Sequence, residues 1–267
     1  MRPLVRSALA LLVLAATQAG AHDTWFSTLE APGAGGIALA LSTGNRYPQN
    51  EFNPGAVNLQ QRACRSANGK PLALEPVQEA EKHLALRAAP TPDAPLPLTC
   101  WAELKPFTVD LPADKVALYF DEIRPNAVVR AAWADMQQRG VPWNERYTKY
   151  ARAEVGVPGS VGATAPAPVG MAMDIVPDVA PHTLKPRAEM GFQVLRDGKP
   201  LADFPVELVS NQLRFARWTT TDQDGRARVV LPFAGGWLLR GTDLRRSETT
   251  PDHWESRFVT LVFELPR

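Results

Sequence analysis

The clearest hydrophobic pattern lies near the end of the chain, where apolar residues alternate with polar ones. Val259, Leu261 and Phe263 fall on one side of the alternation, and Thr260 and Glu264 fall on the other. Successive side chains of a strand point to opposite faces, so this segment is expected to be a half-buried β-strand. Similar short segments recur through residues 171–267: Met171–Val176, Glu189–Leu195, Val206–Val209, Phe215–Thr220, Arg226–Leu231, Gly236–Arg240 and Phe258–Leu265. About seven such strands predict an immunoglobulin-like or prealbumin-like C-terminal β-sandwich.

Strands and turns also dominate the chain from residue 23 to about residue 111. The expected strands are Ile37–Leu41, Asn58–Arg65, Leu72–Val77, His83–Leu86 and Leu98–Leu104. Asn68 and Gly69 favour a tight hairpin turn between the second and the third, because these residues readily adopt positive φ values. Residues 22–156 are therefore expected to form an N-terminal β domain, and the fold class is mainly β.

The apolar spacing changes after Pro112 to intervals of three and four residues. Three groups have this spacing: Val116, Tyr119, Phe120 and Ile123; Val129, Ala132, Trp133 and Met136; and Trp143, Tyr147, Tyr150 and Ala151. They predict a small helical insertion, about residues 112–154, whose apolar stripes pack into the core rather than around a ligand. Residues 157–170, rich in Pro, Gly, Ala and Ser, indicate a linker and a domain boundary.

The first 21 residues have the pattern of an export signal. Arg2 and Arg6 precede an apolar run from Ala8 to Ala16, which is too short to span a bilayer because spanning takes about 20 residues. Small residues then lead to Ala21, as a signal peptidase requires. The prediction is a cleaved signal peptide, a periplasmic mature protein without a retained membrane anchor, and His22 as its first residue.

Charge balance and cysteine content narrow the functional classes. When Arg2 and Arg6 are removed from the 29 basic residues, 27 remain against 28 acidic ones. This balance argues against nucleic acid or an anionic membrane as the main partner. Cys64 and Cys100 are expected to form a disulfide worth up to about 4 kcal/mol. The alternative, a pair of metal thiolates, is disfavoured because the two lie far apart in sequence.

Six strings, taken in order along the chain, resemble a bacterial family of periplasmic proteins of unknown function. They are His22-Asp23-x-Trp25, Glu145 through Ala151, Thr183 through Pro186, Asp197 through Leu201, Thr221-Asp222-x-Asp224-Gly225 and Trp254-Glu255-Ser256. This family is catalogued as the periplasmic component of ABC-type cobalt or nickel uptake. The resemblance implies an exported accessory protein of metal uptake with a C-terminal β-sandwich, and an inner-membrane metal permease as its partner.

The expected metal site is built around His22. A free α-amine and the Nδ1 atom of the same histidine close a six-membered chelate ring on one ion, and Trp25 and Phe26 are expected to anchor the arm that carries them. Asp243 and either Glu255 or His253 are expected to complete the site between the two domains. Nickel or cobalt is favoured, with copper and zinc as alternatives. Many relatives carry histidine in place of Asp243, and a carboxylate makes the site less attractive to copper.

Two alternatives to a non-catalytic metal-binding protein stay open. A copper oxidase with a histidine brace would need a second imidazole, from His83, His182 or His253. Otherwise we expect His83 to be a solvated strand residue and His182 a structural turn residue. The other alternative is an interaction module of the cell envelope in which His22 is incidental. An enzyme is not expected, because the chain lacks Gly-x-Ser-x-Gly, His-Glu-x-x-His and phosphate-loop motifs.

Overall fold

The computed structural model describes residues 22–29, 36–156, 164–212 and 215–267. The expected signal peptide and the first half of the expected linker, residues 157–163, lie outside this part of the chain. The described fold is mainly β with two short α-helices, so the predicted fold class is confirmed. Neither of these two helices is long and apolar enough to cross a membrane.

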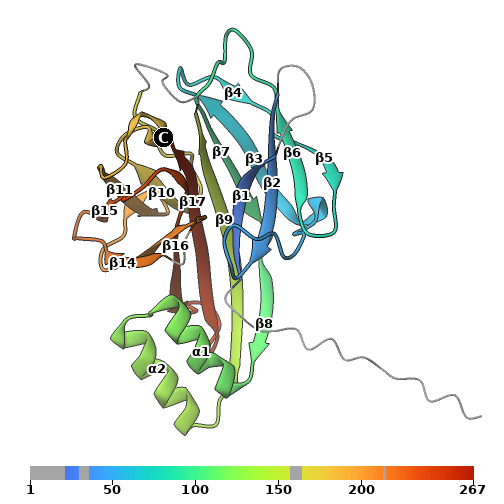
Figure 1. Cartoon of the computed structure of the whole chain (residues 1–267). Helices are drawn as coiled ribbons and strands as arrows, with labels where there is room; N and C mark the ends of the chain where they lie inside the picture. Colours follow the sequence, from blue (N-terminus) through green and yellow to red (C-terminus); the bar gives the residue numbers. More distant parts are fainter. Residues whose placement is uncertain (1–21, 30–35, 157–163, 213–214) are drawn as a thin grey trace, which may run out of the picture.

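One long sheet joins the two halves of the chain (Figure 1). Its strands pair in the order β14-β13-β16-β17-β9-β7-β3-β4, and β8 pairs with β9 beside this path. Their bounds are β3 Leu59–Ser66, β4 Pro71–Leu72, β7 Leu98–Leu104, β8 Phe107–Leu111, β9 Trp143–Val155, β13 Pro205–Ser210, β14 Ala216–Thr220, β16 Gly235–Arg246 and β17 Trp254–Leu265. The last strand, β17, lies inside the sheet, antiparallel to β16 and parallel to β9.

Two smaller sheets cover opposite faces of the long sheet. The first has the order β1-β2-β6-β5, and the second contains β10, β11, β12 and β15. Their bounds are β1 Asp23–Leu29, β2 Ile37–Gly44, β5 Glu75–Glu79, β6 Leu84–Ala88, β10 Met173–Pro177, β11 Glu189–Arg196, β12 Lys199–Pro200 and β15 Arg226–Val230. Ala151 and Ala153 of β9 join the core beneath the first sheet, whereas Tyr150 joins the core beneath the second. Each half is therefore a β-sandwich that uses one face of the shared sheet.

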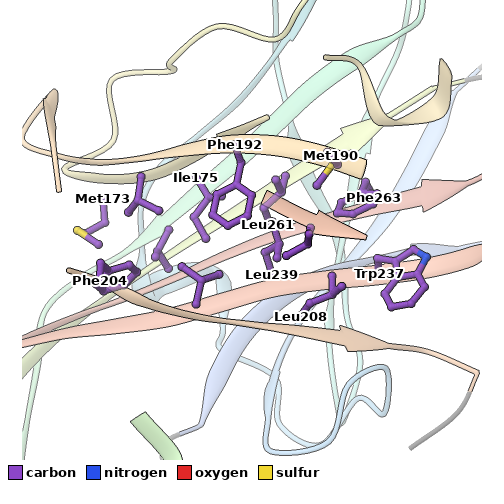
Figure 2. Close-up of a cluster of buried hydrophobic side chains, with 14 of the residues drawn as sticks. Met173, Ile175, Met190, Phe192, Phe204, Leu208, Trp237, Leu239, Leu261 and Phe263 are labelled. Atoms are coloured by element: carbon purple, nitrogen blue, oxygen red, sulfur yellow. The ribbon is translucent and has the colours of Figure 1, made fainter. Parts of the chain in front are cut away.

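The strand predicted at the end of the chain is confirmed by β17. Leu261 and Phe263 lie in the core of the second sandwich (Figure 2), and Val259 belongs to the same core. On the other face, the Thr260 hydroxyl donates a 2.6 Å hydrogen bond to the carbonyl oxygen of Thr24 in β1. The strand thus packs both small sheets against the long one.

The predicted disulfide is also confirmed. Cys64 in β3 and Cys100 in β7 are directly opposite in register, and their sulfur atoms are 2.01 Å apart. Both residues are fully buried in the core of the N-terminal sandwich. The link therefore joins two neighbouring strands of the long sheet.

A helical hairpin packs against one end of the long sheet (Figure 1). It contains α1 Ala113–Ile123 and α2 Ala127–Gln138, and the residues chosen by spacing form its buried face, Val116, Phe120 and Trp133 among them. Asn126 begins α2, because its side-chain oxygen accepts a 3.0 Å hydrogen bond from the backbone N–H of Val129.

The third predicted helix is wrong, because residues 143–155 form strand β9. The insertion therefore ends near residue 142 instead of continuing to about 154. Trp143, Tyr147 and Tyr150 are spaced like a helical stripe, yet β9 pairs with β8 and β7 on one side and with β17 on the other. The pairing with these three strands decides the structure of the segment, because the spacing of apolar residues shows only which side chains can be buried. Trp143 still faces the hairpin, where it stacks on Trp254 at 4.8 Å between ring centres.

A buried ion-pair cluster ties the N-terminal half to the chain that follows the expected linker. Arg152 of β9 is fully buried and lies 2.8 Å from Glu154 and 2.9 Å from Asp174 of β10. Its guanidinium also donates to the carbonyl oxygen of Ala167, at 3.1 Å. The long sheet contains strands from both sides of the expected boundary, and the division into domains 22–156 and 171–267 stays a prediction.

Candidate functional site

The four expected metal ligands are not brought together. Asp243 lies in β16 and is 9% exposed. Its carboxylate lies 2.9 Å from Nε of Arg245 and 2.8 Å from Nε of Arg196, the second contact being an ion pair that is not aligned as a hydrogen bond. Arg240, three residues earlier in the same strand, points to the opposite face, where β1 packs. Asp243 therefore faces away from the start of β1.

Glu255 lies at the start of β17, and His253 immediately precedes the strand. The Glu255 carboxylate accepts a 2.7 Å hydrogen bond from the Ser247 hydroxyl, and His253 Nδ1 lies 2.9 Å from the carbonyl oxygen of Pro251. The start of β1 contacts β17 at Thr260, whose hydroxyl donates to the carbonyl oxygen of Thr24. Thr260 is six residues along the strand from Trp254, which is roughly 20 Å at the usual rise per residue. Within the described ranges, no group of three or more His, Cys, Asp or Glu side chains is arranged to hold a metal ion.

The start of β1 is firmly held. Trp25 and Phe26 are fully buried, as expected of anchors for this arm. His22, the residue before β1, is half-buried, and its ring makes an edge-to-face contact with Phe52 at 5.2 Å between centres. Thr24 accepts the hydrogen bond from Thr260. These contacts fix the position of His22 relative to the long sheet.

A buried chain of charges begins at Asp23, the residue after His22. The Asp23 carboxylate is 4% exposed and lies 2.8 Å from Nη1 of Arg240. Nη2 of Arg240 lies 2.6 Å from the carboxylate of Glu207 in β13. Burial raises the pKa of the Asp23 carboxyl above its usual value, and Arg240 opposes that rise. The ion pairs connect β1 to β16 and β13 across the face that the helical hairpin also covers.

Lys149 of β9 lies close enough to Asp23 to interact with its charge. Its side chain is 8% exposed, and its ammonium nitrogen is 5.3 Å from the ring centre of Tyr147 and 5.8 Å from that of Phe258. Burial lowers the pKa of Lys149 to about 8, and the charge of Asp23 opposes this shift.

A small cavity of about 60 Å³ lies beside Asp23. Its polar lining residues are Asp23, Asn45, Glu122, Arg240 and Thr242. Since a water molecule needs roughly 10–15 Å³, the space suits a few waters. Glu122 comes from the end of α1, so the hairpin forms one wall.

A second buried carboxylate, Glu145, serves the packing of the hairpin. It accepts hydrogen bonds from the hydroxyl of Tyr119 at 2.9 Å, from Nε1 of Trp143 at 3.0 Å and from the hydroxyl of Ser256. Burial raises the pKa of Glu145, and the three donors oppose this rise. Its donors come from α1, β9 and β17, so this group joins three elements and has a structural role.

Sequence reasoning missed Lys149, Glu207 and Arg240 as members of one cluster. A signal exists for Glu207 and Arg240, because both lie inside segments predicted as strands, such as Glu207 between Val206 and Leu208. Charges in such positions are seldom buried unless they are paired. The partners come from distant parts of the chain, so their identity requires the fold.

The fold defines a protein of two β-sandwiches on one shared sheet, with a charge cluster at the first strand. The chain belongs to a family described as a domain of unknown function (DUF4198), whose match covers residues 19–242. This confirms that the chain resembles a family of unknown function. The family's description names neither a metal nor a transporter, so cobalt or nickel uptake stays a prediction.

Other comparisons add little. No curated protein matches the chain in sequence. Among solved structures, the D0-D1 domain of intimin is 11% identical, with a TM-score of 0.23 over 92% of this chain and 98% of its own. Domains A168-A170 of titin are 10% identical, with a TM-score of 0.20 over 82% of this chain and 90% of theirs. At such TM-scores neither likeness bears on function.

Proposed function

We propose that this chain is an exported, non-catalytic protein that binds one divalent transition metal ion at its N-terminus and hands it to an inner-membrane metal permease. Removal of residues 1–21 would give His22 a free α-amine, which chelates the ion together with imidazole Nδ1. Nickel or cobalt is the favoured cargo, and copper and zinc are the alternatives to test, because nitrogen donors suit all four metals.

The observation that carries the proposal is the anchoring of β1 next to His22. Trp25 and Phe26 are buried, and Asp23 is held by Arg240. A chelating residue on a fixed strand loses little conformational freedom when it binds an ion, whereas one on a free tail loses more. Asp243, His253 and Glu255 are left out of the revised site, which is centred on His22. The next residue, Asp23, lines a small cavity together with Glu122.

The sharpest test separates the amine from the imidazole. We would compare protein that begins at His22 with protein carrying one extra glycine before His22, which keeps the imidazole but moves the amine. Calorimetric titration with nickel, cobalt, copper and zinc should give one ion per chain for the first protein, and at least tenfold weaker binding for the second. His22→Ala should bind as weakly as the extended protein, and His83→Ala, as a control, should bind like the unchanged protein.

Two results would contradict the proposal. One is equal binding by the proteins with and without the extra glycine. The other is N-terminal sequencing of exported protein that begins at a residue other than His22, because the amine and the imidazole would then not belong to one residue.

A further inference from the structure

Strand β16 has an open edge along its second half. β17 pairs with β16 along its whole length, from Gly235 to Arg246, whereas β13 pairs with it only at residues 237–240. Among the described residues no strand pairs with the other edge of residues 241–246. Only alternate backbone groups of a strand face a given neighbour, so this half of β16 directs some N–H and C=O groups away from β17. Such an edge is a template for a further strand.

The chain leaves this edge at Pro205, the first residue of β13. The ring of Phe204 and the carbonyl oxygen of Pro205 lie so close to Gly241 that a Cβ there would clash with both. Further back the chain reaches the smaller sheet, where the N–H of Leu201 donates a 3.0 Å hydrogen bond to a carbonyl oxygen of β11. Phe204 therefore marks one end of the open edge, and β13 leaves residues 242–246 uncovered.

A groove of about 410 Å³ follows the open edge. Every residue from Thr242 to Arg246 lines it. Successive side chains of a strand point to opposite faces, so a space that touches all of them runs along the edge and not over one face. The other lining residues come mainly from α2 and from the segment before β13, and the apolar ones are Val128, Val129, Ala132, Leu201, Phe204 and Pro205. An edge flanked in this way is more accessible to a single extended chain than to a second sheet.

Two further side chains of the groove lack partners that a bound peptide would supply. Trp254 also lines the groove and is fully buried, yet its indole Nε1–H has no acceptor within the described ranges. A buried N–H without an acceptor is costly, and a peptide carbonyl is the kind of group that it lacks. Val128 of α2 is 76% exposed, so apolar surface beside the groove is open to contact.

Two arginines lie at the end of the edge away from Phe204. In the described part of the chain, Arg245 donates through Nε to Asp243, and Arg246 donates through Nη2 to Asp252. Their side chains are 42% and 48% exposed. A guanidinium carries five N–H donors, so both groups keep donors for a further acceptor. A carboxylate suits this end because its hydrogen bonds to arginine are charge-assisted.

We propose that the open edge of β16 binds an extended segment of a partner protein, which adds to the long sheet as a further strand. Backbone hydrogen bonds to residues 242–246 supply the affinity, apolar side chains pack beside Val128, and an acidic residue pairs with Arg245 and Arg246. About five residues of the partner, roughly 17 Å of strand, cover the edge. The surface does not include His22, so the proposal stands apart from metal binding.

The probe is a capped hexapeptide of alternating valine and threonine that ends in aspartate. It is added at up to about 5 mM to isotope-labelled protein that begins at His22, a concentration that fills most of a site whose Kd is about 1 mM. The backbone amide signals of residues 242–246 and of Val128 should shift together in the NMR spectrum and saturate. Shifts confined to other residues, or no shift at all, would overturn the proposal.

Two N-methylated versions of the peptide separate strand addition from contacts made by side chains alone. Each carries methyl groups on alternate amides, so one version blocks the donors on one edge of the extended peptide and the second blocks the other edge. One should bind like the parent peptide and the other at least tenfold more weakly, because only one edge faces β16. An equal effect of both versions would contradict strand addition and indicate a pocket for a small molecule.

Variants test the side-chain contacts. Val128→Ser should weaken binding about threefold by removing apolar contact, whereas Val57→Ser, at a valine that is 75% exposed in the N-terminal half, should have no effect. Arg246→Glu should prefer a peptide that ends in lysine, while the unchanged protein prefers the one that ends in aspartate. The same preference in both proteins would overturn the assignment of the acidic residue. Circular dichroism checks that each variant is folded.

Two further results separate this proposal from the alternatives. His22→Ala should bind the peptide like the unchanged protein, so failure of metal binding and failure of peptide binding are distinguishable. Signals of residues 242–246 that shift with protein concentration in the absence of peptide would assign the groove to a second copy of the chain, and would overturn the proposal.

Discussion

His182 lies in a short 3-10 turn, Pro181–Thr183, and its Nε2 atom is buried without a hydrogen-bond partner. The ring packs so closely on Gly156 that a Cβ at that position would clash with the imidazole. Burial lowers the pKa of His182 below its ordinary value. These contacts belong to the packing between β9, β17 and the turn, and they agree with the structural role expected of this histidine.

We predict that His182 makes the protein less stable in mild acid. The unfolded chain binds a proton at this histidine near pH 6.5, while the folded chain resists it, so stability falls as the pH drops below about 6.5 toward the folded pKa. Urea unfolding at pH 7.5 and pH 5.5 should show this loss, and His182→Leu should show less of it. His83→Leu serves as the control and should keep the full dependence. Equal pH dependence in His182→Leu and the unchanged protein would contradict the prediction.

Helices and strands differed in how well their local patterns predicted them. The hairpin α1–α2 followed from its spacing because each helix buries one apolar stripe, and β17 followed from its alternation. Residues 143–155 misled the same reasoning, because Trp143, Tyr147 and Tyr150 fit a helical stripe while their neighbours Glu145 and Lys149 are also buried. Glu145 and Lys149 can be buried because residues of β1, β17 and α1 lie near their charges. These residues are distant in sequence, so the local pattern around positions 143–155 does not reveal them.

The cap of α2 allows a test of one element. Replacing Asn126 by Ala removes the acceptor for the Val129 N–H and should destabilise the protein by about 1 kcal/mol. Asn126→Asp keeps an acceptor at this position and should stay close to the unchanged protein. Equilibrium unfolding in urea measures both variants, and an Asn126→Ala protein as stable as Asn126→Asp would show that the cap contributes nothing.

The molecule as a whole is held together by the shared sheet and by the Arg152 cluster. The mainly β class, the C-terminal sandwich and the disulfide were predictable, because alternation, turn residues and two cysteines are local or compositional signals. The shared sheet was not, because parallel pairing of β9 with β17 joins residues about a hundred positions apart. For the same reason the sequence could not indicate that the described part of the chain leaves the expected ligands apart. Which face Asp243 and Glu255 occupy depends on the register of that sheet.

Arg152→Met tests how strongly the buried cluster joins the two halves. The substitution leaves the carboxylates of Glu154 and Asp174 buried without their cation, and should cost about 3–5 kcal/mol of unfolding free energy. The combined change of Arg152, Glu154 and Asp174 to Met, Leu and Leu should recover part of that loss. Arg228→Met, which breaks an exposed pair with Glu189, is the control and should have no measurable effect. Chemical denaturation compares all three.

The position of β17 also bears on how the fold closes. Residues 254–265 fill the gap between β16 and β9. Without them, β9 and β16 each have an open edge, and neither sandwich has its complete shared wall. We therefore expect the two sandwiches to close in one cooperative and slow step, because pairing between strands that are distant in sequence retards folding.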